Sequence, residues 1–315
     1  MIEIVYGAAE WQSIAPVGTL VLFAMGILLN EAFNGEKHDA QTPFWFSIAG
    51  LVAASAVSIY VWEDGSSAFG GVFTNDGVAM MTNLIACLAG GLSLAMALSH
   101  LEDLGIKARE VYPLVLFTVA GMMIMGGAED LIVLFIGVEI MSIPAYVLAG
   151  LHRRDERSSE AALKYFILGA LASSFLLYGI ALMYGATGSF SYAEIAAALP
   201  AADRGLVLGA MALLIVGLGF KVGIVPFHFW APDVYQGAPT SVTALMAVGI
   251  KAGAAVGMAR LFLTALAPMH AEWSVALWVL SVATMVVVGC SKVFRAGGGC
   301  VPFSLQAGFE HKSQN

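Results

Sequence analysis

The stretch LLIVGLGFKVGIVPFHFWAPDVYQGAPTSV, residues 213–242, decides how the rest of the chain is interpreted. It begins as an apolar helix, but Lys221 interrupts it between glycines, and Pro226 follows five residues later. Glycine and proline around a charge are typical of a broken membrane helix, whose freed backbone groups must be satisfied inside the protein. We therefore predict a helix break at Gly223 and Pro226, with Lys221 beside it.

The composition around this stretch is that of a membrane protein. Of the 315 residues, 59 % are hydrophobic and only 11 % are charged, whereas an average soluble domain has about 25 % charged residues. A net charge of −8 removes the electrostatic basis for nucleic-acid binding. The three cysteines form no CxxC motif or Cys/His cluster, so we predict no metal site and no cofactor-binding residues in this chain.

Apolar stretches long enough to cross a bilayer recur along the whole chain. A helical span needs about 20 apolar residues. The stretches that qualify are roughly 13–30, 43–62, 77–99, 111–128, 130–151, 161–185, 205–227, 240–264 and 273–290. We therefore expect an all-α polytopic membrane protein with about nine transmembrane helices. The N-terminus, MIEIVYGAAEWQ, lacks a basic region, and we predict no cleaved signal peptide.

Basic residues in the loops predict the orientation of the chain. Cytoplasmic loops carry an excess of Lys and Arg. The loops on one side contain Lys37, Lys107, Arg109, Arg153, Arg154, Arg157, Lys292 and Arg295. The loops on the other side contain only Arg204. We expect a multi-pass membrane protein whose basic loops face the cytoplasm and whose N-terminus faces the other side.

Charged residues remain inside three of the predicted spans. A charge near the bilayer centre costs at least ~2.5–3.5 kcal/mol, so such residues default to functional hypotheses. Glu139 lies roughly 13 Å into its span and Lys251 roughly 16 Å into its own, and Lys221 lies at the predicted break. Structural alternatives remain for each: a permanently protonated Glu139, a Lys221 that snorkels to the interface, or a purely structural ion pair for Lys251. Together these groups indicate a proton or cation pathway.

Other polar residues are more ambiguous by position. Lys164 begins its span, where snorkelling is favoured, and Arg260 is interpreted as an interfacial anchor. His228 is a candidate proton carrier because imidazole titrates near neutrality, but a hydrogen-bonded structural histidine fits equally well. Asp233 and Tyr235 are expected in a loop or a re-entrant turn.

Three segments resemble a known family. They are FKVGIVPFHFWAPDVYQGAPTSVTA (220–244), SSEAALKYFILGALASSFLLYGIALMYGATGS (158–189) and LFIGVEIMSIPAYVLAGL (134–151). They resemble the subunit N family of bacterial NADH-quinone oxidoreductase, respiratory complex I, whose members are antiporter-like membrane subunits related to Mrp-type Na⁺/H⁺ antiporter subunits. The resemblance covers residues 1–290, approximately.

The resemblance implies proton translocation driven by quinone reduction elsewhere in the complex. It implies that Glu139 pairs with Lys221 and that protonation passes on to Lys251. Lys164 modulates that pair, and His228 has a near-channel or structural role. The implied partners are the other membrane subunits of complex I and the lipid bilayer, with no nucleic acid. The resemblance also implies that quinone, NADH, FMN and Fe–S clusters are bound by partner subunits. The implied location is the bacterial inner membrane, with the N-terminus on the periplasmic side.

The resemblance also implies a division of the chain. Residues 1–110 form N-terminal helices, 111–266 a first antiporter-like repeat of five helices, 267–290 the first helix of a second repeat, and 291–315 a tail unlike the family. We therefore expect a C-terminally truncated chain in which the rest of the second repeat, with its exit-side lysine, is missing. Two alternatives stay open: an Mrp-type cation/proton antiporter subunit, and a non-pumping structural subunit.

Overall fold

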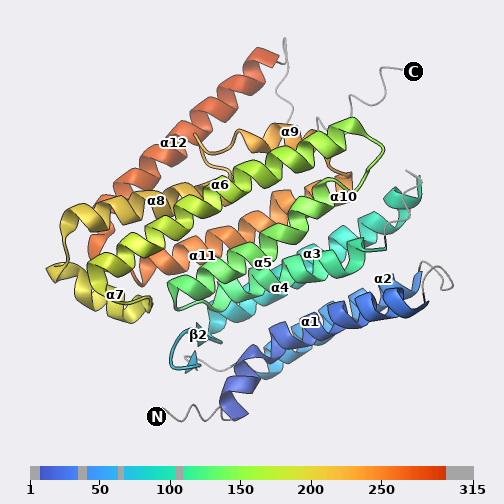
Figure 1. Cartoon of the computed structure of the whole chain (residues 1–315), viewed down its shortest axis with the longest axis horizontal. Helices are drawn as coiled ribbons and strands as arrows, with labels where there is room; N and C mark the ends of the chain where they lie inside the picture. Colours follow the sequence, from blue (N-terminus) through green and yellow to red (C-terminus); the bar gives the residue numbers. More distant parts are fainter. Residues whose placement is uncertain (1–7, 35–40, 63–66, 104–108, 296–315) are drawn as a thin grey trace.

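The computed structural model describes residues 8–34, 41–62, 67–103 and 109–295, and it is a bundle of long helices (Figure 1). The long or apolar helices are α1 (Ala8–Asn34), α2 (Gln41–Tyr60), α3 (Gly77–Asp103), α4 (Val111–Gly127), α5 (Leu131–Ala149), α6 (Glu156–Thr187), α8 (Arg204–Val222), α11 (Lys251–Leu263) and α12 (His270–Arg295). Helix α10 (Thr240–Ala244) and the π-helical η3 (Leu245–Ile250) lead directly into α11.

These helices confirm an all-α polytopic membrane protein. Within the described residues, eight helical segments are long and apolar enough to cross a membrane, with α10, η3 and α11 counted as one, and α4 is a shorter apolar helix. Their total matches the nine predicted spans. The one sheet among the described residues is a hairpin of two-residue strands, β1 (Ser67–Ala68) and β2 (Phe73–Thr74), paired antiparallel.

Helices α4 and α5 form the centre of the bundle. A Cβ added to Gly121 of α4 would lie 2.2 Å from the backbone nitrogen of Met141 in α5. A Cβ on Gly137 of α5 would in turn lie 2.8 Å from the Met125 side chain of α4. Glycine at these positions lets the two backbones approach closely, which is how membrane helices gain packing contacts without a hydrophobic driving force.

The turn between α4 and α5 lies at Ala128–Asp130, where the sequence predicts it. It pairs with backbone on both sides: Glu129 N–H donates to the Val72 carbonyl, and Tyr192 N–H donates to the Glu129 carbonyl, each at 3.0 Å. The turn therefore joins the β hairpin to the segment that leads into α7 (Tyr192–Ala198), which is followed by the 3₁₀ helix η2 (Leu199–Ala201). The boundary between the spans 111–128 and 130–151 predicts the turn, but the sequence gives no sign of these small elements.

Several predicted boundaries differ from the structure. Helix α8 ends at Val222 rather than near residue 227, because Gly223 adopts a left-handed φ of 79° and donates its N–H to the Gly219 carbonyl. Such a C-cap is a position that glycine fills without strain. Asp233 and Tyr235, expected in a loop or re-entrant turn, lie in the short helix α9 (Trp230–Gly237).

The end of the chain differs in part from the prediction. Helix α12 continues to Arg295, past residue 290, where the sequence predicts the last helix to end and the tail to begin. Residues 296–315 of the predicted tail, and Lys37 and Lys107 of the predicted cytoplasmic loops, lie outside the described residues. Helix α12 lies at the edge of the bundle in Figure 1, and its large apolar side chains Trp278 and Met285 are exposed.

Candidate proton relay site

Lys221 is buried at the break of the broken helix. It lies in the last turn of α8, is only 1 % exposed, and its Nζ donates a hydrogen bond of 2.7 Å to the Tyr146 Oη of α5. The same Nζ lies 5.0 Å from the centroid of the Tyr146 ring and 5.5 Å from that of Phe220. Snorkelling to the interface is therefore wrong for Lys221, which is an enclosed amine held by a phenol and two aromatic faces.

Glu139 is half-buried in α5 and lies near Lys221 without touching it. Its carboxylate accepts a short hydrogen bond from the Ser173 hydroxyl of α6. Among the described residues no ion pair joins Glu139 to Lys221, although the carboxylate interacts electrostatically with both Lys221 and Tyr146. The direct pair implied by the resemblance is therefore absent from this structure. Tyr146 holds the position next to the amine instead.

Lys251 approaches the same break from another helix. It is the first residue of α11, and its Nζ lies 5.5 Å from the centroid of the Tyr235 ring in α9. A Cβ added to Gly223 would lie 3.6 Å from this Nζ. The break in α8 therefore brings the Lys251 amine close to backbone only two residues beyond Lys221.

The segment before Lys251 is π-helical. Segment η3 ends at Ile250, directly before Lys251. π-Helical turns are rare in proteins, and those that occur are often found at functional sites. They change the direction in which the following side chains point. Gly249, Gly253 and Gly257 recur every four residues and form a glycine stripe on this helix. The stripe packs on α4, with Gly253 against Met122 and Gly257 against Met125.

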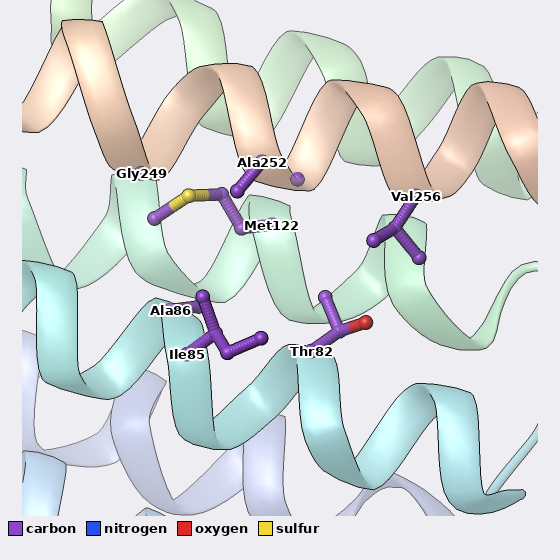
Figure 2. A pocket seen from close by; sticks show the side chains of 8 residues that line it. Thr82, Ile85, Ala86, Met122, Gly249, Ala252 and Val256 are labelled. Atoms are coloured by element: carbon purple, nitrogen blue, oxygen red, sulfur yellow. The ribbon is translucent and has the colours of Figure 1, made fainter.

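A small cavity lies beside this glycine stripe (Figure 2). It has a volume of about 20 Å³ and is lined by Thr82, Ile85, Ala86, Met122, Gly249, Ala252, Gly253 and Val256. A cavity of this size has room for one water, but a cavity with apolar walls stays dry. The residues that line the cavity from η3 and α11 recur three or four positions apart, so they share one face of the helix. Lys251 does not lie on that face. The cavity is therefore a packing gap and not part of the candidate relay.

Lys164 lies at an exposed end of the bundle. Its Nζ pairs with Asp233 of α9 at 2.6 Å and with Glu160 of α6 at 2.7 Å. The Lys164 side chain is 43 % exposed, which agrees with the predicted location near an interface. Among the described ion pairs and hydrogen bonds, none joins Lys164 to Glu139 or Lys221. The contact with Asp233 instead connects α6 to the short helix that follows the break.

The segment from Pro226 to Phe229 lies between α8 and α9. His228 stacks on Phe229 with ring centroids 4.9 Å apart, and its Nδ1 is buried without a hydrogen-bond partner among the described residues. Val225 N–H donates to Thr284 Oγ1 of α12 at 3.0 Å. Trp230 Nε1 donates to the Phe220 carbonyl at 2.9 Å, so α9 returns to cover the end of α8.

Sequence reasoning missed Tyr146 and Ser173 and misplaced Arg260. Tyr146 is seven residues after Glu139, and this spacing places both on one helix face, a signal that was available. The Arg260 side chain is not exposed as an anchor would be: it is only 5 % exposed and is paired with Asp76 at 2.5 Å and with Glu129. A membrane helix with one arginine, flanked in space by carboxylates from two loops, could be recognised only once those loops were placed.

The fold and the site together define a helical membrane protein in which a carboxylate and two amines gather around a broken helix. Among the described residues, no three metal-ligating side chains come together. Residues 128–294 match the family model described as NADH:quinone oxidoreductase/Mrp antiporter, TM. The chain belongs to this family.

Relatives within the family share a name. A protein of Trichlorobacter lovleyi named NADH-quinone oxidoreductase subunit N is 40 % identical over 277 residues, which are 87 % of this chain and 57 % of the relative. The protein of the same name from Chloroflexus aggregans is 41 % identical over 285 residues, 88 % of this chain and 58 % of the relative. The chain therefore spans a little more than half the length of the curated relatives it matches.

Solved structures show the same fold. A chain of respiratory complex I from Thermus thermophilus with bound aureothin is 35 % identical, with a TM-score of 0.66 over 78 % of this chain and 52 % of that chain. A chain of the Mrp complex from Dietzia sp. is 23 % identical, with a TM-score of 0.75 over 94 % of this chain and 56 % of that chain. The second match shows the fold alone.

Proposed function

We propose that this chain is a proton-translocating membrane subunit of an NADH-quinone oxidoreductase. In this proposal Glu139, Lys221 and Lys251 form the relay, Lys164 modulates it, and quinone reduction in partner subunits drives it. The observation that carries the proposal is the position of Lys221, a fully buried amine at a helix break, with the Lys251 amine beside Gly223. A buried lysine has no packing role that an apolar residue would not fill better, which favours a functional role.

The contacts suggest how each group acts. The Lys221 amine takes up a proton when neutral and returns it when charged, and the Glu139 carboxylate stabilises the charged form. The Tyr146 hydroxyl accepts the hydrogen bond from Lys221, so it orients the amine and can pass a proton by giving up its own. Lys251, near the same break, is the next acceptor. If the ion pair between Lys164 and Asp233 opens, the electrostatic field at that exposed end of the bundle changes.

The names of the relatives favour complex I over an antiporter. The two relatives described above are called subunit N of NADH-quinone oxidoreductase, and the Mrp likeness is one of fold. On this proposal the partners are other membrane subunits and the surrounding lipid, and NADH, FMN, Fe–S clusters and quinone are bound by those partners. The N-terminus lies on the periplasmic side of the inner membrane.

Proton pumping by the assembled complex in membrane vesicles tests the proposal. We expect Lys221→Met and Glu139→Gln each to reduce NADH-driven pumping at least about tenfold, with the complex still assembled. Arg204→Met is the control, because Arg204 is exposed and pairs only with Glu272 among the described ion pairs. Replacement of Na⁺ by choline in the assay distinguishes the antiporter alternative.

The outcomes separate the three functions. Loss of pumping in both relay variants, with no effect of Na⁺, supports the proposal. Pumping that requires Na⁺ and not quinone would favour an antiporter subunit. Normal pumping by both variants in an assembled complex would mean that the buried charges are structural.

A further inference from the structure

A second cluster of buried charges lies apart from the relay. Arg260, in the last turn of α11, pairs with Asp76 just before α3 and with Glu129 in the α4–α5 turn. The Asp76 and Glu129 side chains are 31 % and 25 % exposed, so the cluster is close to water but mostly enclosed. Three segments that are far apart in the sequence meet at this one guanidinium.

The cluster carries more negative than positive charge. One guanidinium faces the carboxylates of Asp76 and Glu129, and Asp130 adjoins them as the N-cap of α5. Asp130 is committed to that role, because its Oδ1 accepts two backbone N–H groups of the first helical turn. Burial raises the pKa of Glu129, Arg260 opposes this effect, and the Asp76 charge adds to it. Glu129 is therefore the member suited to bind a proton.

An unpartnered hydroxyl points to the same conclusion. Tyr192 of α7 is 1 % exposed, and its Oη has no hydrogen-bond partner among the described residues. Its phenol interacts electrostatically with Glu129, Arg260 and Asp130, so it belongs to the cluster. A hydroxyl can donate to a carboxylate and accept from a carboxylic acid. Tyr192 can therefore serve Glu129 in either protonation state.

The cluster lies at the end of the bundle opposite Lys164. Helix α6 runs from Lys164 to Thr187 over roughly 35 Å, close to the thickness of a bilayer core. The segment that follows α6 bonds to the cluster through Tyr192 N–H and the Glu129 carbonyl. The Lys164 group and the Arg260 cluster thus lie near opposite faces of the membrane.

The cluster also lies at one end of two of the helices that carry proposed relay groups, α5 and α11. Glu139 is ten residues after Glu129 along α5, and Lys251 is nine residues before Arg260 along α11. Each separation corresponds to roughly 14 Å along a helix axis. The cluster is thus joined by a single helix to the carboxylate and by another to one of the amines of the proposed relay.

We propose that the Asp76–Glu129–Arg260 cluster is a proton-binding site through which the relay exchanges protons with water at this face. The inference rests on the proposed function. Glu129 carries the proton, and Arg260 and Asp76 are positioning residues. The proton adds to one carboxylate oxygen of Glu129 to give the neutral acid and leaves from that oxygen to water, so no other bond forms or breaks.

The test measures pumping by the assembled complex in vesicles over a range of pH. The variants are Glu129→Gln, which keeps the shape but cannot bind the proton, and Tyr192→Phe, which removes only the hydroxyl. Glu194→Gln is the matched control, because Glu194 is an exposed acid on α7 whose carboxylate accepts a hydrogen bond from the Ser189 hydroxyl. Infrared spectra of the complex report the carboxylic-acid C=O band independently of pumping.

We expect Glu129→Gln to lower pumping at least about tenfold and to remove one titrating carboxylic-acid band, with Glu194→Gln unchanged. Normal pumping in Glu129→Gln together with loss in Lys221→Met overturns this inference alone. Normal pumping in both variants overturns the proposed function as well. If Glu129→Gln does not assemble, Tyr192→Phe decides: a shifted pH profile supports the inference, and a profile identical to the unmodified complex overturns it.

Discussion

At the scale of single residues, the candidate site depends on a few side chains whose neighbours cannot be exchanged freely. Lys221 relies on Tyr146 as its hydrogen-bond partner, and an unsatisfied buried ammonium costs more than an ordinary lost hydrogen bond. Gly223 has two roles: its left-handed φ ends α8, and its missing side chain leaves the Lys251 amine next to bare backbone. The proposed relay therefore depends here on an uncharged residue.

Gly223→Ala should disturb the relay as well as the fold. A non-glycine residue at this left-handed φ costs about 1–2 kcal/mol, and the new methyl would lie 3.6 Å from the Lys251 Nζ. Gly188→Ala is the control, because Gly188 has a similar φ of 77° and nothing within 4 Å of an added Cβ. We expect similar losses of thermal stability in both variants but reduced pumping only in Gly223→Ala. Equal pumping in the two would show that contact with Lys251 is irrelevant.

At the scale of elements, the relay depends on close helix pairs. Helix α5 carries Glu139 and Tyr146, and its distance from α4 is set by Gly121 and Gly137. Helix α11 carries Lys251 and packs on α4 through its glycine stripe. Because α4 supports both, a change in its packing moves groups of the relay that it does not itself contain.

Gly121→Ala should separate α4 from α5. The added Cβ would lie 2.2 Å from the Met141 nitrogen, and backbone cannot yield as a flexible side chain can. We expect a loss of about 1–3 kcal/mol or more, measured as a lower thermal unfolding midpoint and a lower yield of assembled complex. Gly26→Ala in α1 is the control, since nothing lies within 4 Å of its added Cβ. An unchanged midpoint in Gly121→Ala would contradict the close pairing of α4 and α5.

At the scale of the whole molecule, the Arg260 cluster joins segments that lie far apart in the sequence. Arg260 and Asp76 are 184 residues apart, and Arg260 and Glu129 are 131 apart. Buried ion pairs of this kind contribute more to holding one arrangement than to net stability, because desolvation offsets much of their attraction. We infer that the cluster fixes how α11, the start of α3 and the α4–α5 turn are placed relative to one another.

The pH dependence of stability should report on this cluster. Because burial raises the pKa of Glu129 above its ordinary value of 4.5, the folded protein keeps this proton over a pH range in which the unfolded chain has lost it. The corresponding stability is complete below the ordinary pKa and is lost as pH rises through the raised value. Glu129→Gln should flatten this part of a plot of unfolding midpoint against pH in lipid nanodiscs. Identical slopes for the variant and the unmodified protein would contradict the raised pKa.

The sequence by itself determined the class of protein and the helices, and it supplied the candidate residues of the proposed relay. Apolar stretches long enough to cross a membrane have to form helices here, since every backbone polar group in the bilayer must be hydrogen-bonded within the segment. The buried charges Glu139, Lys221 and Lys251 stand out because their cost in lipid is high. The break after Lys221 could also be predicted, because glycine and proline act locally.

Only the tertiary structure decided which charges meet. It places the Tyr146 hydroxyl against the Lys221 amine, brings Lys251 to Gly223, and buries the Arg260 side chain between two carboxylates instead of leaving it exposed. These contacts join residues on different helices, and their geometry depends on crossing angles and on π-helical and short helical segments. Hydrophobic periodicity determines which face of a helix is buried, but a side chain's partner depends on how neighbouring helices pack.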